Sequence, residues 1–281
     1  MGVCVSLLKQ TVLGGLLAAI GAMAAAEDAP LRRLLGADEA RAWEAVGRIN
    51  MEGAGFCTGA LIAPDLVLTA AHCMYYKRTA RQIPPEKIHF LAGWRKGRAA
   101  AHRKARRVVI HSDYDYADAS KLDRVAADIA IIELDQPIRA SVVTPFKRYE
   151  RPRPGDAVTV VSYAQERAEV PSLQEPCHML GRQSDVLVLS CEVNYGASGA
   201  PIFVMSEEGP RIASVVSAMA QWNSKDVALG TSLGAPLDEL LAQIREAPSA
   251  FKAVTPVRSS LDERLGREKR DVRKVVVPPS D

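Results

Sequence analysis

Two short segments of the sequence carry residue types that could activate a serine. The first runs from Phe56 to Cys73 and ends in Thr-Ala-Ala-His-Cys, and the second reads Gly196-Ala197-Ser198-Gly199. A serine hydroxyl is a weak nucleophile at neutral pH, so it needs a base for its proton and an anion site for the oxygen that becomes charged. Small residues around Ser198 allow a sharp turn that can aim the N–H groups of Gly196 and Ser198 at one point. The two segments therefore predict acyl transfer through Ser198.

The base should be one of the five histidines of the chain. By itself, a histidine beside a cysteine is more often structural. His72 differs from the others because it ends an apolar run and is followed by Cys73. A disulfide at Cys73 would fix the backbone of the histidine, as a positioned base requires.

Asp128 is the candidate for the third member of a triad. It heads the run Asp-Ile-Ala-Ile-Ile-Glu-Leu, and a carboxylate at the head of an apolar strand is costly unless it has a partner. Four other aspartates lie in the polar loop just before it and are typical of turns: Asp113, Asp115, Asp118 and Asp123. Asp128 is therefore predicted to orient His72 and to stabilise its imidazolium.

The His72 segment, the Asp128 strand and the Ser198 segment resemble the three signature blocks of the trypsin/chymotrypsin-like serine proteases, in that family's order. The resemblance covers roughly residues 43–247, and its detail is closer to the bacterial secreted branch than to the animal digestive enzymes. It implies an all-β fold of two antiparallel β-barrels with the active site between them. It also implies a serine endopeptidase that cleaves protein or peptide substrates through an acyl-enzyme, without a metal or an organic cofactor.

One position departs from the family pattern. Family members usually carry an aspartate directly before the nucleophile, and in the digestive enzymes it pairs with the N-terminal ammonium that zymogen cleavage frees. Here the position holds Ala197, so we expect activity not to depend on one defined new N-terminus. A pro-segment could still block the cleft, with Arg32-Arg33 as its site of removal. Ala197 also supports an alternative function, a catalytically idle relative that binds proteins, because a poorly formed oxyanion hole would leave a complete triad idle.

Specificity stays open at this point. Glu192 stands six residues before Ser198, where the digestive enzymes place the base of the specificity pocket, and an acid there would favour Arg or Lys at the cleavage site. Cys191 is not in the family's usual place, however, so Glu192 could equally face solvent. The segment Ser217-Ala218-Met219 resembles the edge that pairs with the substrate backbone. Val216 stands where glutamate-specific relatives often carry histidine, which argues against a glutamate preference.

Short apolar runs separated by turn residues predict the strands that position these residues. The expected strands are Val46–Met51, Phe56–Ile62, Leu66–Ala71, Ile88–Ala92, Val108–His111 and Ile129–Leu134, then Val158–Ser162, Val186–Cys191, Ala200–Val204, Ile212–Met219 and Val227–Leu233. The segment Thr144–Asp156, rich in Pro, Arg and Lys, is typical of a linker between two halves. After Pro236, four apolar residues recur at helical spacing and predict a closing helix over 236–247: Leu237, Leu240, Leu241 and Ile244.

The first 26 residues read as a secretory signal peptide. They contain one charge, Lys9, and an apolar run from Thr11 to Ala22 followed by small residues. A membrane anchor is the second interpretation, because the apolar run is short for a bilayer. We expect a secreted or periplasmic protein with no stable membrane insertion after cleavage.

Four cysteines remain once Cys4 leaves with the signal peptide, and an even number in an exported chain indicates disulfides. Four cysteines allow three pairings, of which we expect the sequential one, Cys57–Cys73 and Cys177–Cys191. A zinc site is the alternative, but the spacings fit no common zinc motif.

Length and charge complete the outline. The chain has 281 residues, 48% of them hydrophobic, so it can bury a substantial core. A net charge of +3 does not indicate nucleic acid as a partner. We expect a pro-segment or N-terminal arm over 27–42, a protease domain over 43–247 (barrels about 43–145 and 155–235), a polar mobile tail over 248–281, and a monomer.

Overall fold

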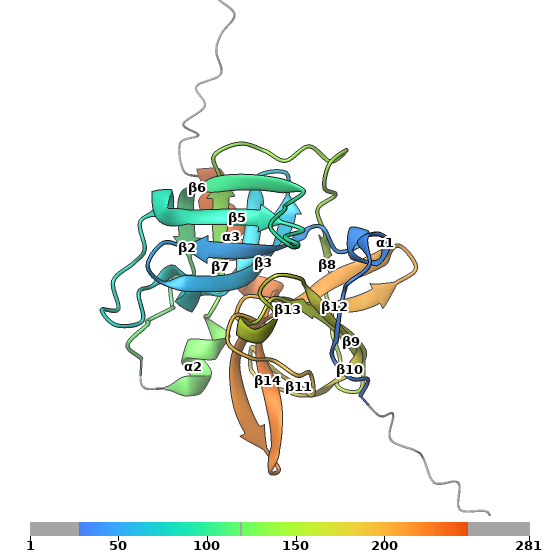
Figure 1. Cartoon of the computed structure of the whole chain (residues 1–281). Helices are drawn as coiled ribbons and strands as arrows, with labels where there is room; N and C mark the ends of the chain where they lie inside the picture. Colours follow the sequence, from blue (N-terminus) through green and yellow to red (C-terminus); the bar gives the residue numbers. More distant parts are fainter. Residues whose placement is uncertain (1–27, 119, 247–281) are drawn as a thin grey trace, which may run out of the picture.

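Two closed six-stranded antiparallel barrels make up most of the computed structural model, which describes residues 28–118 and 120–246 (Figure 1). The strand order of the first barrel is β2-β3-β4-β7-β6-β5. Its strands are β2 (Val46–Met51), β3 (Gly55–Ala63), β4 (Leu66–Thr69), β5 (Ile88–Ala92), β6 (Ala101–Ile110) and β7 (Ala130–Leu134). Closure leaves neither of its edge strands unpaired.

The second barrel closes in the order β9-β10-β11-β14-β13-β12, with β12 pairing back to β9. Its strands are β9 (Ala157–Ser162), β10 (Ser172–Gln183), β11 (Val186–Leu189), β12 (Pro201–Ser206), β13 (Gly209–Trp222) and β14 (Lys225–Ser232). Two short strands join its outside: β1 (Arg32–Arg33) pairs with β10, and β8 (Lys147–Arg148) runs parallel to β13. The expected fold class of two trypsin-like barrels is confirmed.

Three helices accompany the barrels: α1 (Ala37–Arg41), α2 (Lys121–Ala126) and α3 (Gly234–Glu246). Short 3-10 turns cover Ala71–Met74, Pro85–Lys87 and Gln165–Arg167. The closing helix expected over 236–247 corresponds to α3, and residue 247 lies outside the described residues. Figure 1 shows α3 returning from the second barrel to lie against the first. There its Leu237 and Leu240 join the buried core of that barrel.

The segment before β2 is bound to the second barrel through its backbone and a buried side chain. Ala29 donates its N–H to the Pro176 carbonyl at 2.8 Å, and β1 continues the contact along β10. Leu34 is completely buried. In Figure 1 this segment, coloured blue, runs beside β9 and β10.

The two barrels share one hydrophobic core. Trp43, Phe146 and Phe203 pack together, with ring centroids of Phe146 and Phe203 4.6 Å apart. Val161 and Val215 of the second barrel belong to the same buried cluster as the interior of the first. A smaller buried cluster consists of apolar side chains from all six strands of the second barrel. The halves are therefore packed against each other as one unit.

Both disulfides form in the sequential pairing, Cys57–Cys73 and Cys177–Cys191. The first links β3 to the 3-10 turn after β4, and the second links β10 to the segment after β11. Among the described residues, no helix is long and apolar enough to cross a membrane. The expected signal peptide over 1–26 and the expected tail over 248–281 lie outside the described residues.

Candidate active site

His72 lies on the 3-10 turn Ala71–Met74, directly after β4. The turn is fixed by the Cys57–Cys73 disulfide and by the buried Ala70 and Ala71 before it. The imidazole itself is 23% exposed, so it faces the space between the barrels rather than the core. Its backbone is thus held while the ring stays accessible.

Asp128 follows α2 and stands two residues before β7, with only 3% of its surface exposed. One carboxylate oxygen accepts the His72 backbone N–H at 2.8 Å, and the other contacts His72 Nδ1 at 2.7 Å. Because an ionised carboxylate can only accept, Nδ1 carries the imidazole proton and Nε2 keeps its lone pair. This is the tautomer that a general base needs.

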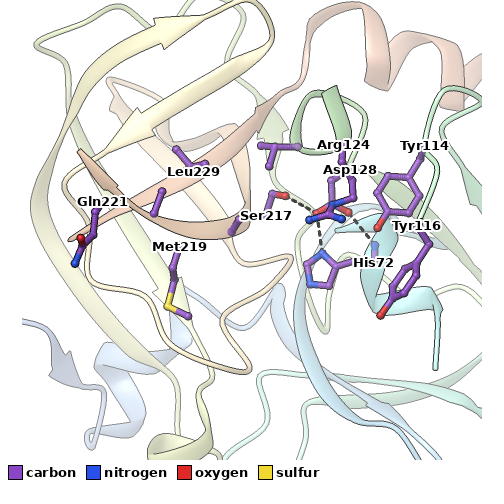
Figure 2. Close-up of a pocket in the computed structure, with 12 residues that line it drawn as sticks. His72, Tyr114, Tyr116, Arg124, Asp128, Ser217, Met219, Gln221 and Leu229 are labelled. Carbon is purple, nitrogen blue, oxygen red and sulfur yellow. Dashed lines mark hydrogen bonds and ion pairs between the residues drawn. The ribbon is translucent and has the colours of Figure 1, made fainter. Parts of the chain in front are cut away.

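Ser217, from the second barrel, contacts the same carboxylate. It lies on β13, and its hydroxyl donates to the Asp128 oxygen that also contacts His72 (Figure 2). From the sequence, Ser217 was expected only on the edge that binds the substrate, and its contact with Asp128 was not predicted. Thr231 of β14 also reaches across, with its hydroxyl 2.7 Å from the Val125 carbonyl and 3.3 Å from that of Asp128. The buried carboxylate thus has three donors, two from His72 and one from Ser217, as a buried charge requires, while Thr231 holds the backbone beside it.

The Ser198 segment turns sharply at two glycines. Gly196 has φ +98° and Gly199 has φ +75°, in the left-handed region that favours glycine. A side chain at Gly199 would lie 2.1 Å from Thr69 Oγ and 2.4 Å from the Thr58 carbonyl oxygen. The segment therefore packs closely on the wall of the first barrel, just before His72.

Two backbone donors of this segment are unused. The N–H groups of Ala197, Gly199 and Ala200 donate to carbonyl oxygens at 2.7–2.9 Å. Within the described part of the chain, the N–H groups of Gly196 and Ser198 donate to no acceptor. Backbone donors without an acceptor in a tight turn are available to bind an anion.

The structure does not join Ser198 to His72 by a hydrogen bond among the residues it describes. Instead, His72 Nε2 lies 3.8 Å from Cys73 Sγ. Sγ of Cys57 and Cys73 and the His72 ring form a close group, but both sulfur atoms belong to the disulfide. Since a thiolate is the form of cysteine that binds metals, the group is not a metal site while the disulfide is intact.

A cavity of about 640 Å³ opens on one side of the His72–Asp128 pair (Figure 2). Tyr114 and Tyr116 line it from the first barrel, and Ser217 and Met219 from the second. Burial, and then the negative charge of Asp128, raise the pKa of Tyr114 above its usual range. Its phenol therefore stays neutral beside the carboxylate.

A second cavity, of about 650 Å³, contains Glu192. Val193, Met219 and Asp226 also line it, so two carboxylates lie on one cavity. The backbone N–H of Glu192 donates to Gln174 at 2.7 Å. Asp226 accepts a hydrogen bond from Gln221 at 3.3 Å, and sequence reasoning had not singled it out.

The segment Ser217-Ala218-Met219 has one free edge. The pairing of β13 with β12 ends at Val215, whereas its pairing with β14 continues from Ala218 to Trp222. Met219 is 50% exposed beside this edge. An extended peptide could add to β13 here as a further strand.

Comparisons with known proteins agree with this geometry. A family model described as Trypsin matches residues 36–229. Coagulation factor IX of Cavia porcellus is 28% identical over 123 residues, which covers 41% of this chain and 38% of that relative. The match thus spans well under half of the length of factor IX.

Solved protease structures share the fold. A Glu endopeptidase in complex with MPD superposes with a TM-score of 0.64 at 17% identity, covering 78% of this chain and 97% of that one. Protease Anisep from Arthrobacter nicotinovorans gives a TM-score of 0.59 at 16% identity, covering 76% and 98%. The thermostable serine protease AL20 from an extremophilic microorganism gives 0.56 at 17%, covering 72% and 98%.

Proposed function

The chain belongs to the trypsin family of serine proteases, and we propose that it is a secreted endopeptidase with His72, Asp128 and Ser198 as its catalytic triad. The observation that carries the proposal is the hydrogen bond between Asp128 and His72 Nδ1, since it leaves Nε2 as a base. In the proposed reaction Ser198 attacks a peptide carbonyl while His72 takes its proton. His72 then protonates the leaving amine, and water hydrolyses the acyl-enzyme by the same route.

The unused N–H groups of Gly196 and Ser198 support an oxyanion hole at this site. They would bind the carbonyl oxygen as it becomes negative in the tetrahedral intermediate. Losing one such donor typically costs about 10²–10³ in kcat. The missing hydrogen bond between Ser198 and His72 fits an enzyme without substrate, in which catalytic contacts are often long and shorten in the complex.

Hydrolysis of fluorescently labelled casein tests this proposal. We expect the wild-type protein to release fluorescent peptides, and Ser198→Ala and His72→Ala each to lower kcat by about 10⁶. A third variant, His102→Ala, is the matched control, because His102 pairs with His89 on the outside of the first barrel. Equal cleavage by wild type and Ser198→Ala would contradict the proposed nucleophile.

Secretion is the second part of the proposal. Two disulfides support an oxidising compartment, either outside the cell or in a periplasm, because disulfides are rare in a reducing cytosol. Fractionation of cells that express the full chain should place the mature protein outside the cytosol, with an N-terminus near Glu27. An intact N-terminus in the cytosolic fraction would contradict it.

The two carboxylates of the second cavity support a preference for Arg or Lys at the cleavage site. Glu192 is exposed, and its carboxylate makes no hydrogen bond or ion pair among the described residues. Arg167 interacts with it electrostatically, so a cationic substrate would share the Glu192 charge with Arg167. The Glu endopeptidase is similar in fold alone and carries no argument for a glutamate preference.

Glu192→Gln tests this specificity. We expect kcat/KM for an arginyl peptide substrate to fall about 10-fold or more, since one charge pair is removed, while a leucyl substrate is unaffected. Glu207→Gln, an exposed acid on the β12–β13 turn, is the control for net charge. Equal losses for the two variants, or for both substrates, would show that Glu192 does not select the substrate.

A further inference from the structure

Thr58 stands where the wall of the first barrel meets the Ser198 segment. It lies on β3 next to Cys57 and is completely buried. Its hydroxyl donates to the Gly196 carbonyl oxygen at 2.8 Å and accepts the Tyr163 N–H at 3.0 Å. Its own N–H donates to the Ser198 carbonyl oxygen at 2.9 Å. One residue thus holds both residues whose N–H groups would form the oxyanion hole.

The hydroxyl fixes the peptide that lies between the two donors. Gly196 and Ala197 share this peptide, and its N–H donates to the Asn194 carbonyl at 2.9 Å. The N–H and C=O of a planar trans peptide point in opposite directions, so two partners on opposite sides hold its plane. Without Thr58, only the bond to Asn194 would remain.

The peptides on either side are held with their carbonyls bonded. The Tyr195 carbonyl accepts the Gln165 N–H at 2.8 Å, and the Ala197 carbonyl accepts the Ala200 N–H at 2.9 Å. The N–H group of each of these peptides points away from the partner of its carbonyl. The peptide that Thr58 holds joins the two, so it sets the spacing and relative orientation of the two unused donors.

Ala197 itself is uncharged and completely buried, so its side chain makes no polar contact that could hold the turn. The polar contacts of Thr58 come from the other barrel. We infer that Thr58 is a positioning residue, whose hydroxyl holds the oxyanion hole in its working shape before any substrate binds. The inference rests on the proposed function of Ser198 and adds the residue that organises its anion site.

The values of kcat and KM distinguish this positioning role from a merely structural one. The oxyanion exists only in the transition state and the intermediate, so a loosened anion site lowers kcat and leaves KM nearly unchanged. A structural role predicts a lower melting temperature with normal kcat in the folded protein. The affinity of a peptide boronic acid, which mimics the tetrahedral intermediate, should follow kcat.

The test compares three variants at Thr58 with one at Ser206. We expect Thr58→Val to lower kcat and boronic acid affinity at least about 10-fold, with KM changed by less than about 3-fold. Thr58→Ser keeps the hydroxyl and should restore most of the activity. Thr58→Ala also removes the hydroxyl but does not place a methyl group next to the Gly196 oxygen. This variant replaces Thr58→Val in the test if the valine variant does not fold.

Ser206→Ala is the matched control. Its hydroxyl also donates to a glycine carbonyl, that of Gly209 at 2.8 Å, but on the β12–β13 turn and not on the Ser198 segment. We expect it to lose stability with kcat close to wild type. Unchanged kcat in Thr58→Ala, or equal losses of kcat in Ser206→Ala and Thr58→Ala, would overturn the inference. An inactive wild type that resembles Ser198→Ala in the same assay would instead overturn the proposed function.

Discussion

At the residue scale, Asp128 is the centre of the proposed catalytic site. Its carboxylate meets His72 from the first barrel and Ser217 from the second, and it is almost fully buried. Its acceptor-only character sets which nitrogen of His72 carries the proton. The contact with Ser217 links residues 89 positions apart. Sequence patterns within one strand carry no signal for such a contact.

Asp128→Asn should therefore remove the correct tautomer without removing the hydrogen bonds. An amide can donate to Nδ1, and the imidazole proton then lies on Nε2. A protonated Nε2 has no lone pair with which to accept the Ser198 proton. We expect kcat to fall by about 10⁴, a loss of the size that this change causes in well-studied members of the family. Stopped assays on a chromogenic peptide measure it, with Asp113→Asn in the neighbouring polar loop as the control. Similar activity in both variants would contradict the role of Asp128.

At the element scale, the strands with regular alternation were predictable and the irregular ones were not. β2 and β5 have the bounds expected from their apolar runs. β10 was missed because Pro176 and Gly181 interrupt its pattern and its register shifts at two places. The first half of β6 was missed because it is basic, from Arg103 to Arg107, and its charged side chains are exposed or only partly buried. It therefore lacks the alternation of apolar residues that predicts a strand.

The N-terminal arm shows a second limit of sequence reasoning. β1 is a pair of arginines, and it is held to β10 through its backbone, which composition does not reveal. The arm is also linked to Glu192, which lines the second cavity, through Gln174. Gln174 is buried, and its amide donates to the Ala29 carbonyl at 2.9 Å while its oxygen accepts the Glu192 N–H at 2.7 Å. We propose that the arm stays part of the mature enzyme rather than acting as a pro-segment.

Deleting residues 27–33 tests this role. Removal leaves the buried Gln174 amide without an acceptor, which costs about 1–3 kcal/mol, so the melting temperature should fall by roughly 5 °C. KM should rise because the support of Glu192 is loosened. Arg32→Ala is the control, since it keeps the backbone pairing and removes an exposed side chain. Higher activity after deletion would show that the arm is an inhibitory pro-segment.

At the scale of the whole molecule, the site exists only where the barrels meet. The Tyr163 hydroxyl donates to the Trp94 carbonyl at 2.8 Å, and Lys96 donates its N–H to the Glu169 carbonyl at 2.7 Å. Together with the shared core around Trp43 and Phe203, these contacts join the two halves. Resemblance to known proteases predicted this two-barrel arrangement, whereas the contacts that hold the anion site needed the structure.

The shared core predicts that the two barrels unfold together. Far-ultraviolet circular dichroism reports the strands of both barrels, and the fluorescence of Trp43, Trp94 and Trp222 reports the junction and both barrels. The two signals should give coincident denaturation midpoints. A Phe203→Ala variant should shift both midpoints equally. Two separated transitions would contradict a single cooperative unit and would indicate barrels that fold independently.

Labelling with a fluorophosphonate probe tests most directly whether Ser198 is an activated nucleophile. We predict a stoichiometric adduct that peptide mass spectrometry places on Ser198 in the exported, processed protein, and none in Ser198→Ala. Thr58→Ala should label more slowly than wild type. Absence of labelling in a folded, processed wild-type protein would contradict the account and would favour a protease-like protein that binds its partners without cleaving them.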